Sequence, residues 1–282
     1  MGVHMQQHGG QLGLGKTWHF LRCLIDLQGS KTTKRQNLNK ITHTCTGTDD
    51  EFIRDIQNRY IGSITRERQN AYTGRENPAL YEMTEADVRA EMLRLRTKSA
   101  PDPDGITNKI LRNLSDESIA AITKYINECW QQGAKPPQWK TAHVVMIPKP
   151  EKKILIENLR PIYLTLCVGK LMEHVVLIRL SNYMEDRVLY PLTMIGLRPK
   201  MFTQDVLLQI KHQILDARGR VTGPKAILGL DLTKAFVNIT HKVVLGNLQD
   251  LGVGRQAYTY VRDFFSNRTA QITIGEIKSD DI

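Results

Sequence analysis

Asp231 is the residue of this sequence whose position points most directly to chemistry. It follows five apolar or glycine residues, Ala226-Ile-Leu-Gly-Leu230, and precedes Thr-Lys-Ala-Phe236. The run is short and follows Gly223-Pro224, which predicts a buried strand. A carboxylate at the end of such a strand needs a cation, a helix N-terminus or hydrogen-bond donors, because burying a bare charge is costly. The pattern leaves two equal alternatives, a metal ligand or a cap of the next helix.

A second motif near the start of the chain suggests phosphate binding. Residues 10–17 read Gly-Gln-Leu-Gly-Leu-Gly-Lys-Thr and match the GxxxxGK[ST] pattern of a phosphate-binding loop. That loop needs a hydrophobic strand before it, and the nine preceding residues are polar and rich in His and Gln. We therefore interpret the match as a coincidence and keep a nucleotidase as the least favoured function.

Composition indicates the class of partner. The chain has 282 residues, a net charge of +10 and a pI near 9.4. This charge favours a polyanionic partner, most simply a nucleic acid. The four cysteines are far apart and form no ligand pattern, so we expect thiols without disulfide partners in a reducing compartment. The sequence predicts no signal peptide and no membrane-spanning run, which favours an intracellular protein of the cytoplasm or nucleus.

The elements that must position these residues are mixed in type. Thr48 and Thr84, each followed by acidic residues, predict helix starts, and Ser115 and Gly133 predict the two ends of another helix. The remaining apolar patterns predict helices over 167–183, 203–217, 243–251 and 255–266, and strands over 141–147, 226–230 and 269–277. This order predicts an α+β fold.

Five blocks of the sequence occur in the order of a known family. They are Lys98-Ser-Ala-Pro-Asp-Pro-Asp-Gly105, Trp139-Lys-Thr-Ala-His-Val-Val-Met-Ile-Pro-Lys-Pro150, Asn158-Leu-Arg-Pro-Ile162, Gly196-Leu-Arg198 and Leu230-Asp-Leu-Thr-Lys-Ala-Phe236. Together they resemble the reverse transcriptase domain of non-LTR (LINE-type) retrotransposons, closely the arthropod members. The resemblance implies the fingers and a partial palm of a right-hand polymerase over residues 84–282, preceded by a helical, partly flexible linker over residues 1–83.

The resemblance also implies roles for individual residues. Asp231 matches the first catalytic aspartate, which would hold Mg²⁺ or Mn²⁺ together with the main-chain carbonyl of Leu232. Phe236 matches the gate beneath the nucleotide sugar, although the residues without the resemblance favour a core Phe one helical turn after Asp231. Lys149 and Arg160 match fingers residues that approach the triphosphate of a dNTP. Arg198 lies in a block near the template and nucleotide. The implied partners are an RNA template, a DNA primer and a dNTP.

The sequence also departs from the family. Val237 replaces an Asp of the family pattern, and the second acidic block, Tyr-x-Asp-Asp, is missing after the last predicted strand. Asp280 and Asp281 come too early to replace that block. We therefore expect a truncated RNA-directed DNA polymerase domain, inactive by itself. The alternative is a non-catalytic remnant that binds nucleic acid through its basic residues.

Overall fold

The protein has an α+β fold of helices and one small sheet, described here from a computed structural model. The structure describes residues 38–39, 41–42, 47–61, 71–80, 82–98, 104–149, 152–153, 155–212, 226–232, 239–274 and 277–282. The chain divides into two compact units. Unit 1 comprises residues 1–65, 142–164 and 269–282, and unit 2 comprises residues 66–141 and 165–268.

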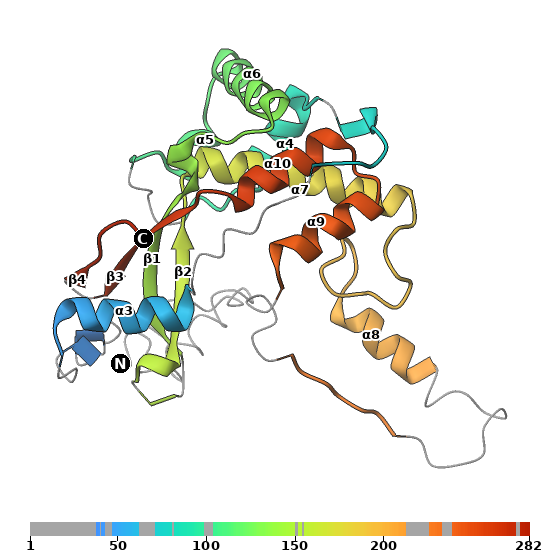
Figure 1. Cartoon of the computed structure of the whole chain (residues 1–282). Helices are drawn as coiled ribbons and strands as arrows, with labels where there is room; N and C mark the ends of the chain where they lie inside the picture. Colours follow the sequence, from blue (N-terminus) through green and yellow to red (C-terminus); the bar gives the residue numbers. More distant parts are fainter. Residues whose placement is uncertain are drawn as a thin grey trace, which may run out of the picture. The chain divides into compact units, whose positions relative to one another are not determined.

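Unit 1 is built on a four-stranded sheet with the strand order β2-β1-β3-β4 (Figure 1). The strands are β1 (Thr141–Pro148), β2 (Leu159–Leu164), β3 (Thr269–Ile274) and β4 (Ile277–Lys278). Buried and partly buried residues alternate along β1 and β3, as expected for strands with one covered face. Val144, Met146 and Ile272 are fully buried on that face, where they join one apolar cluster with Phe52 and Ile56.

Helix α3 (Asp49–Tyr60) supplies the helical part of this core. It begins as predicted at Thr48, whose hydroxyl accepts from the backbone N–H of Glu51, while the Glu51 carboxylate accepts from the backbone N–H of Thr48. This reciprocal capping satisfies two backbone donors that the helix itself leaves free. It therefore fixes where the helix starts and which face carries Phe52 and Ile56.

Unit 2 is helical and has the larger core. Its elements are η1 (Pro78–Leu80), α4 (Glu85–Arg94), α5 (Asn108–Leu111), α6 (Asp116–Gln132), η2 (Pro137–Lys140), α7 (Cys167–Asp186), α8 (Thr203–Ile210), α9 (His241–Asp250) and α10 (Arg255–Phe265). The predicted starts at Thr84 and Ser115 and the end at Gly133 are confirmed, and Gly133 has the left-handed φ of 60° that favours glycine.

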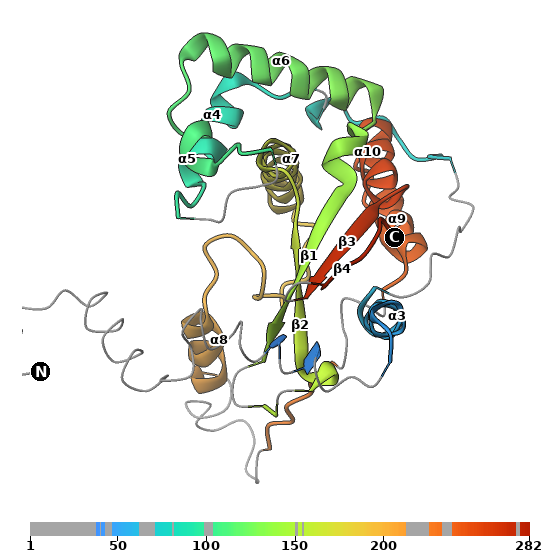
Figure 2. The same cartoon turned by 90° about the vertical axis from the view of Figure 1, so that its left-hand side faces the viewer.

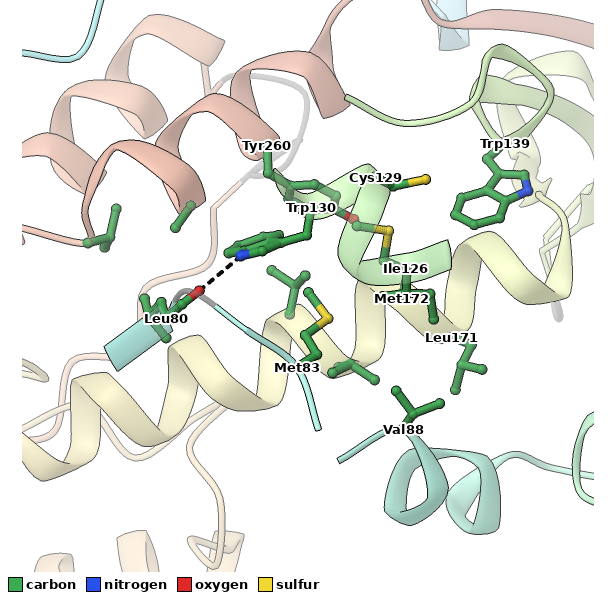
Figure 3. Close-up of a cluster of buried hydrophobic side chains, with 14 of the residues drawn as sticks. Leu80, Met83, Val88, Ile126, Cys129, Trp130, Trp139, Leu171, Met172 and Tyr260 are labelled. Carbon is green, nitrogen blue, oxygen red and sulfur yellow. Dashed lines mark hydrogen bonds between the residues drawn. The ribbon is translucent and has the colours of Figure 1, made fainter. Parts of the chain in front are cut away.

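The core of unit 2 draws on α4, α6, α7 and α10 (Figure 3). Leu171, Met172 and Val175 of α7 are fully buried among them. Trp130 of α6 packs against Tyr260, with 5.1 Å between the centres of the two rings. Its indole N–H donates to the carbonyl of Leu80 at 3.0 Å. The indole thus fixes η1 to α6.

Residues 71–80 form an ordered strap on the turn between α9 and α10. The Tyr72 hydroxyl accepts from the backbone N–H of Gly254 at 3.1 Å and donates to the carbonyl of Arg75 at 2.6 Å. The Asn77 amide donates to the carbonyl of Gly252 at 3.4 Å, and Tyr72 is buried. This stretch therefore packs within unit 2. The division of the chain into a linker over residues 1–83 and a polymerase domain from residue 84 stays a prediction.

Two strand predictions need correction. Residues 226–232 are extended but form no strand, and Leu228, Leu230 and Leu232 are 81%, 83% and 77% exposed. An apolar run becomes a strand only when another strand pairs with it, and its composition does not supply that partner. The single strand predicted over 269–277 is the hairpin β3–β4, in which Ile274 pairs with Ile277.

Other predictions concern helices and cysteines. The helix expected over 203–217 is confirmed as α8 up to Ile210, and those over 167–183, 243–251 and 255–266 are α7, α9 and α10. Cys129 and Cys167 are buried thiols. Within the described ranges, no helix is both long and apolar enough to cross a membrane. The phosphate-loop match at 10–17 lies outside the described residues.

Candidate nucleic-acid and nucleotide site

The β1–β2 hairpin brings Lys149 and Arg160 to one face of the sheet. The strands are antiparallel, with Ile147 opposite Arg160 and Pro148 opposite Leu159. One step further, the backbone N–H of Lys149 donates to the carbonyl of Asn158 at 2.8 Å. Residues opposite each other in such a pair point to the same side, and so do residues two apart along a strand. Lys149 and Arg160 are therefore diagonal neighbours on one face.

The apolar pattern of the hairpin selects that face. Val144, Met146 and Leu159 are buried on the opposite side, so a shift of the register by one residue would bury the cations and expose the core. Arg160 is exposed and Lys149 is half-buried. Among the described residues, the Lys149 ammonium reaches only the carbonyl of Glu157, at 3.5 Å. Both cations are thus held by a rigid strand pair and face outward, where they can bind an anion.

The connection between the two strands adds Lys152 and Lys153, which the sequence interpretation did not single out. Both are exposed, and the Asn158 amide donates to the carbonyl of Lys153 at 3.0 Å. The Tyr60 hydroxyl donates to the carbonyl of Ile156 at 2.6 Å, which ties the hairpin to the end of α3. Their position in the sequence could have indicated that they bind anions, because the connection between two paired strands projects from the sheet.

Asp231 and Leu232 lie in unit 2, in the extended stretch that follows Ala226. Both are exposed. An exposed carboxylate and a nearby main-chain carbonyl are oxygen ligands, the type that Mg²⁺ prefers. Among the residues that the structure describes, no three His, Cys, Asp or Glu side chains gather in a way that could hold a metal ion. Phe236 lies outside the described residues.

Arg198 is held by groups of its own unit. Its Nε and Nη2 donate to the two carboxylate oxygens of Glu185 at 2.9 and 2.6 Å, and Nη1 donates to the carbonyl of Met194 at 3.2 Å. The guanidinium carbon lies 5.2 Å from the centre of the Tyr190 ring. Hydrogen bonding from Arg198 lowers the pKa of Glu185 below its ordinary value. In this arrangement the guanidinium braces the 185–198 segment.

Comparison with known proteins finds relatives of one kind. No protein-family model matches the chain. The chain is similar to the RNA-directed DNA polymerase from mobile element jockey of Drosophila melanogaster, with 27% identity over 200 residues, 70% of this chain and 21% of the relative. It is also similar to the probable RNA-directed DNA polymerase from transposon BS of the same organism, with 25% identity over 240 residues, 79% of this chain and 26% of the relative. The chain is similar to reverse transcriptases of LINE-type retrotransposons. The resemblance seen in five sequence blocks is thereby confirmed.

A further relative matches over a shorter stretch of the chain. The probable RNA-directed DNA polymerase from transposon X-element of Drosophila melanogaster is 29% identical over 156 residues, 55% of this chain and 17% of the relative. The chain therefore spans between about a sixth and a quarter of the length of these curated relatives. The comparisons support the domain type.

Proposed function

We propose that this LINE-type chain is the fingers and part of the palm of an RNA-directed DNA polymerase, which binds an RNA template, a DNA primer and an incoming dNTP. The observation that carries the proposal is the similarity to relatives named as RNA-directed DNA polymerases, which covers most of the chain. The hairpin adds independent physical support, because a rigid pair of outward-facing cations suits a polyphosphate or a nucleic-acid backbone.

Lys149 and Arg160 would bind the phosphates. The Arg160 guanidinium offers five N–H donors and can bind two phosphate oxygens at once, whereas the Lys149 ammonium acts as a compact charge. Both side chains start from paired strands, so little ordering is needed when the anion arrives. They would also offset charge that develops on the transferred phosphoryl group.

Asp231 and the carbonyl of Leu232 would hold Mg²⁺ or Mn²⁺. One carboxylate and one carbonyl fit Mg²⁺ in kind, because this ion commonly takes one or two carboxylates and completes its shell with water and substrate phosphates. The ion would supply charge stabilisation for nucleotidyl transfer. Asp231 itself would orient the ion, and it is accessible to do so because the stretch that carries it is exposed.

Phe236 and Arg198 are the remaining residues that we propose to bind a nucleotide. Phe236 would lie beneath the nucleotide sugar and exclude a 2′-hydroxyl. Arg198 engages three of its five N–H groups with Glu185 and Met194, so two remain to bind a nucleotide or template.

A second candidate function is nucleic-acid binding without catalysis. The exposed cations of the hairpin favour it, because Lys152, Lys153 and Arg160 attract phosphates whether or not Asp231 binds a metal ion. In both cases we place the protein in the cytoplasm or nucleus, where RNA and a reducing environment occur together.

Primer extension on an RNA template, with dNTPs and Mg²⁺ or Mn²⁺, tests the proposal beside the Asp231→Ala variant. Extension that vanishes in the variant supports polymerase activity in this chain. Salt-sensitive RNA binding without extension agrees with the expected inactivity of a partial palm and with the second candidate alike. Extension that is unchanged in Asp231→Ala overturns the assignment of Asp231, and a chain that neither binds RNA nor extends a primer overturns both functions.

A further inference from the structure

A group of exposed cations lies on unit 2, where the end of α4 meets α5. We call it the α4–α5 patch, and its members are Arg94, Arg96, Lys98, Lys109 and Arg112, each exposed. Figure 2 shows α4 and α5 as neighbours. Lys109 and Arg112 are three residues apart on a helical segment and so lie near each other on its surface. None of the five belongs to the site residues proposed above.

Hydrogen bonds between side chains and backbone hold the two segments together. The Asn108 amide donates to the carbonyl of Arg96 at 3.1 Å. The Arg112 guanidinium donates to the carbonyl of Leu95 at 3.0 Å, which leaves most of its five donors available. The Thr107 hydroxyl caps α5 by accepting from the backbone N–H of Ile110 at 3.3 Å. These hydrogen bonds therefore hold the backbone segments that carry the cations in a fixed arrangement.

In the described segments that carry the patch, few acidic groups offset this charge. Residues 91–98 and 104–112 contain two, Glu91 and Asp104. Glu91 is buried and pairs with Arg94 at 2.5 Å, while Asp104 accepts from the backbone N–H of Ile106 at 2.9 Å. Lys98, Lys109 and Arg112 thus give the patch a local excess of positive charge. Such an excess on an exposed surface attracts polyanions.

We propose that the α4–α5 patch binds the sugar-phosphate backbone of a nucleic acid and is a contact surface separate from the β1–β2 hairpin. The inference rests on the proposed function, which provides the polyanion. The patch carries no aromatic ring on which a base could stack; its exposed apolar side chains are Leu93 and Ile110. Binding would therefore depend on phosphate charge and show little sequence preference.

The test is the salt dependence of binding to a fluorescent single-stranded RNA, measured by anisotropy on the full chain. The patch variant is Lys98→Gln with Lys109→Gln. The control is Lys124→Gln with Lys242→Gln, which removes the same net charge from exposed positions on α6 and α9 of the same unit. A third protein carries Lys149→Gln with Arg160→Gln. Thermal melts of all three establish that they fold.

Each phosphate contact with a single strand contributes about 0.7 to the slope of log K against log salt. We expect the patch variant to lose about 1.4 from this slope and the control to keep the parent value.

A patch variant that behaves as the control overturns the inference, and it leaves the proposed function standing if the hairpin variant still lowers the slope. A parent chain that does not bind RNA overturns the proposed function itself. A patch variant that loses binding to an acidic polypeptide but not to RNA would assign the surface to a protein partner and overturn the inference.

Discussion

Arg160 lies opposite Ile147 in the β1–β2 ladder, and this register places its guanidinium on the same face as Lys149. The relationship brings together two blocks that are separate in the sequence. It depends on the burial of Val144, Met146 and Leu159 on the other face. The cations are therefore positioned by the hydrophobic core of unit 1.

The substitution Gly254→Ala tests whether the strap of residues 71–80 packs against the turn between α9 and α10. Its φ is +89°, and a Cβ added there would lie 2.8 Å from Cβ and 2.9 Å from the backbone nitrogen of Asn77. Gly254→Ala should lower the free energy of unfolding by about 2 kcal/mol or more, through backbone strain and loss of strap contacts. Gly246→Ala, in α9 with open space around it, should instead raise it by about 0.5–1 kcal/mol. Urea denaturation measures both, and equal effects would contradict the packing of the strap.

Asp263 links the segment before β1 to α10. Its carboxylate accepts from the Lys140 ammonium at 2.6 Å and from the backbone N–H of Lys135 at 2.7 Å, and the Lys140 side chain is only 8% exposed. Asp263→Ala should lower the free energy of unfolding by about 3–5 kcal/mol, because it leaves the buried Lys140 ammonium without its carboxylate partner. Glu128→Ala, at an exposed position of α6, should change stability by less than about 0.5 kcal/mol. A loss in Asp263→Ala no larger than the control would show that the Lys140 charge has another partner.

Tyr260 is buried, and its hydroxyl has no hydrogen-bond partner in the described part of the chain. Burial raises the pKa of this phenol. Tyr260→Phe should raise the free energy of unfolding by about 1 kcal/mol, since it removes an unsatisfied polar atom. Tyr72→Phe should lower it by about the same amount, because that hydroxyl makes two hydrogen bonds. The same unfolding measurement compares them, and a destabilised Tyr260→Phe would mean that its hydroxyl is bonded.

The Arg198–Glu185 pair predicts a pH dependence. Hydrogen bonding lowers the pKa of Glu185 in the folded protein, so the carboxylate stabilises the fold above its unfolded pKa, and this contribution is lost as the pH falls through the folded value. Glu185→Gln should therefore be less stable than the parent at pH 7, and the difference should shrink steadily below about pH 4.5. Unfolding curves across this range check the prediction. A difference that stays constant with pH would mean that the Glu185 charge does not stabilise Arg198.

The sequence predicted local structure better than strand pairing. Thr48, Thr84, Ser115 and Gly133 act through neighbours three or four residues away, so their helix ends could be inferred from the sequence. The stretch before Asp231 was predicted to be buried but is exposed, because pairing depends on residues far away in the chain.

The candidate site shows the same division. The resemblance named Lys149 and Arg160, and the strand register explains why they lie on one face. It did not indicate that Glu185 would hold Arg198, since that partner lies thirteen residues upstream on α7 and belongs to none of the family blocks. The packing of residues 71–80 likewise depends on α9 and α10, which are more than 160 residues further along.

Binding of single-stranded RNA as a function of salt, compared between the parent, Lys149→Gln with Arg160→Gln, and Asp231→Ala, tests the central claim most directly. The account predicts that the double variant binds more weakly and that its slope of log K against log salt falls by about 1.4, one contact for each lost cation. It predicts that Asp231→Ala retains the parent slope, because that carboxylate serves a metal ion. A double variant with the parent slope would contradict the assignment of the hairpin as a phosphate-binding site.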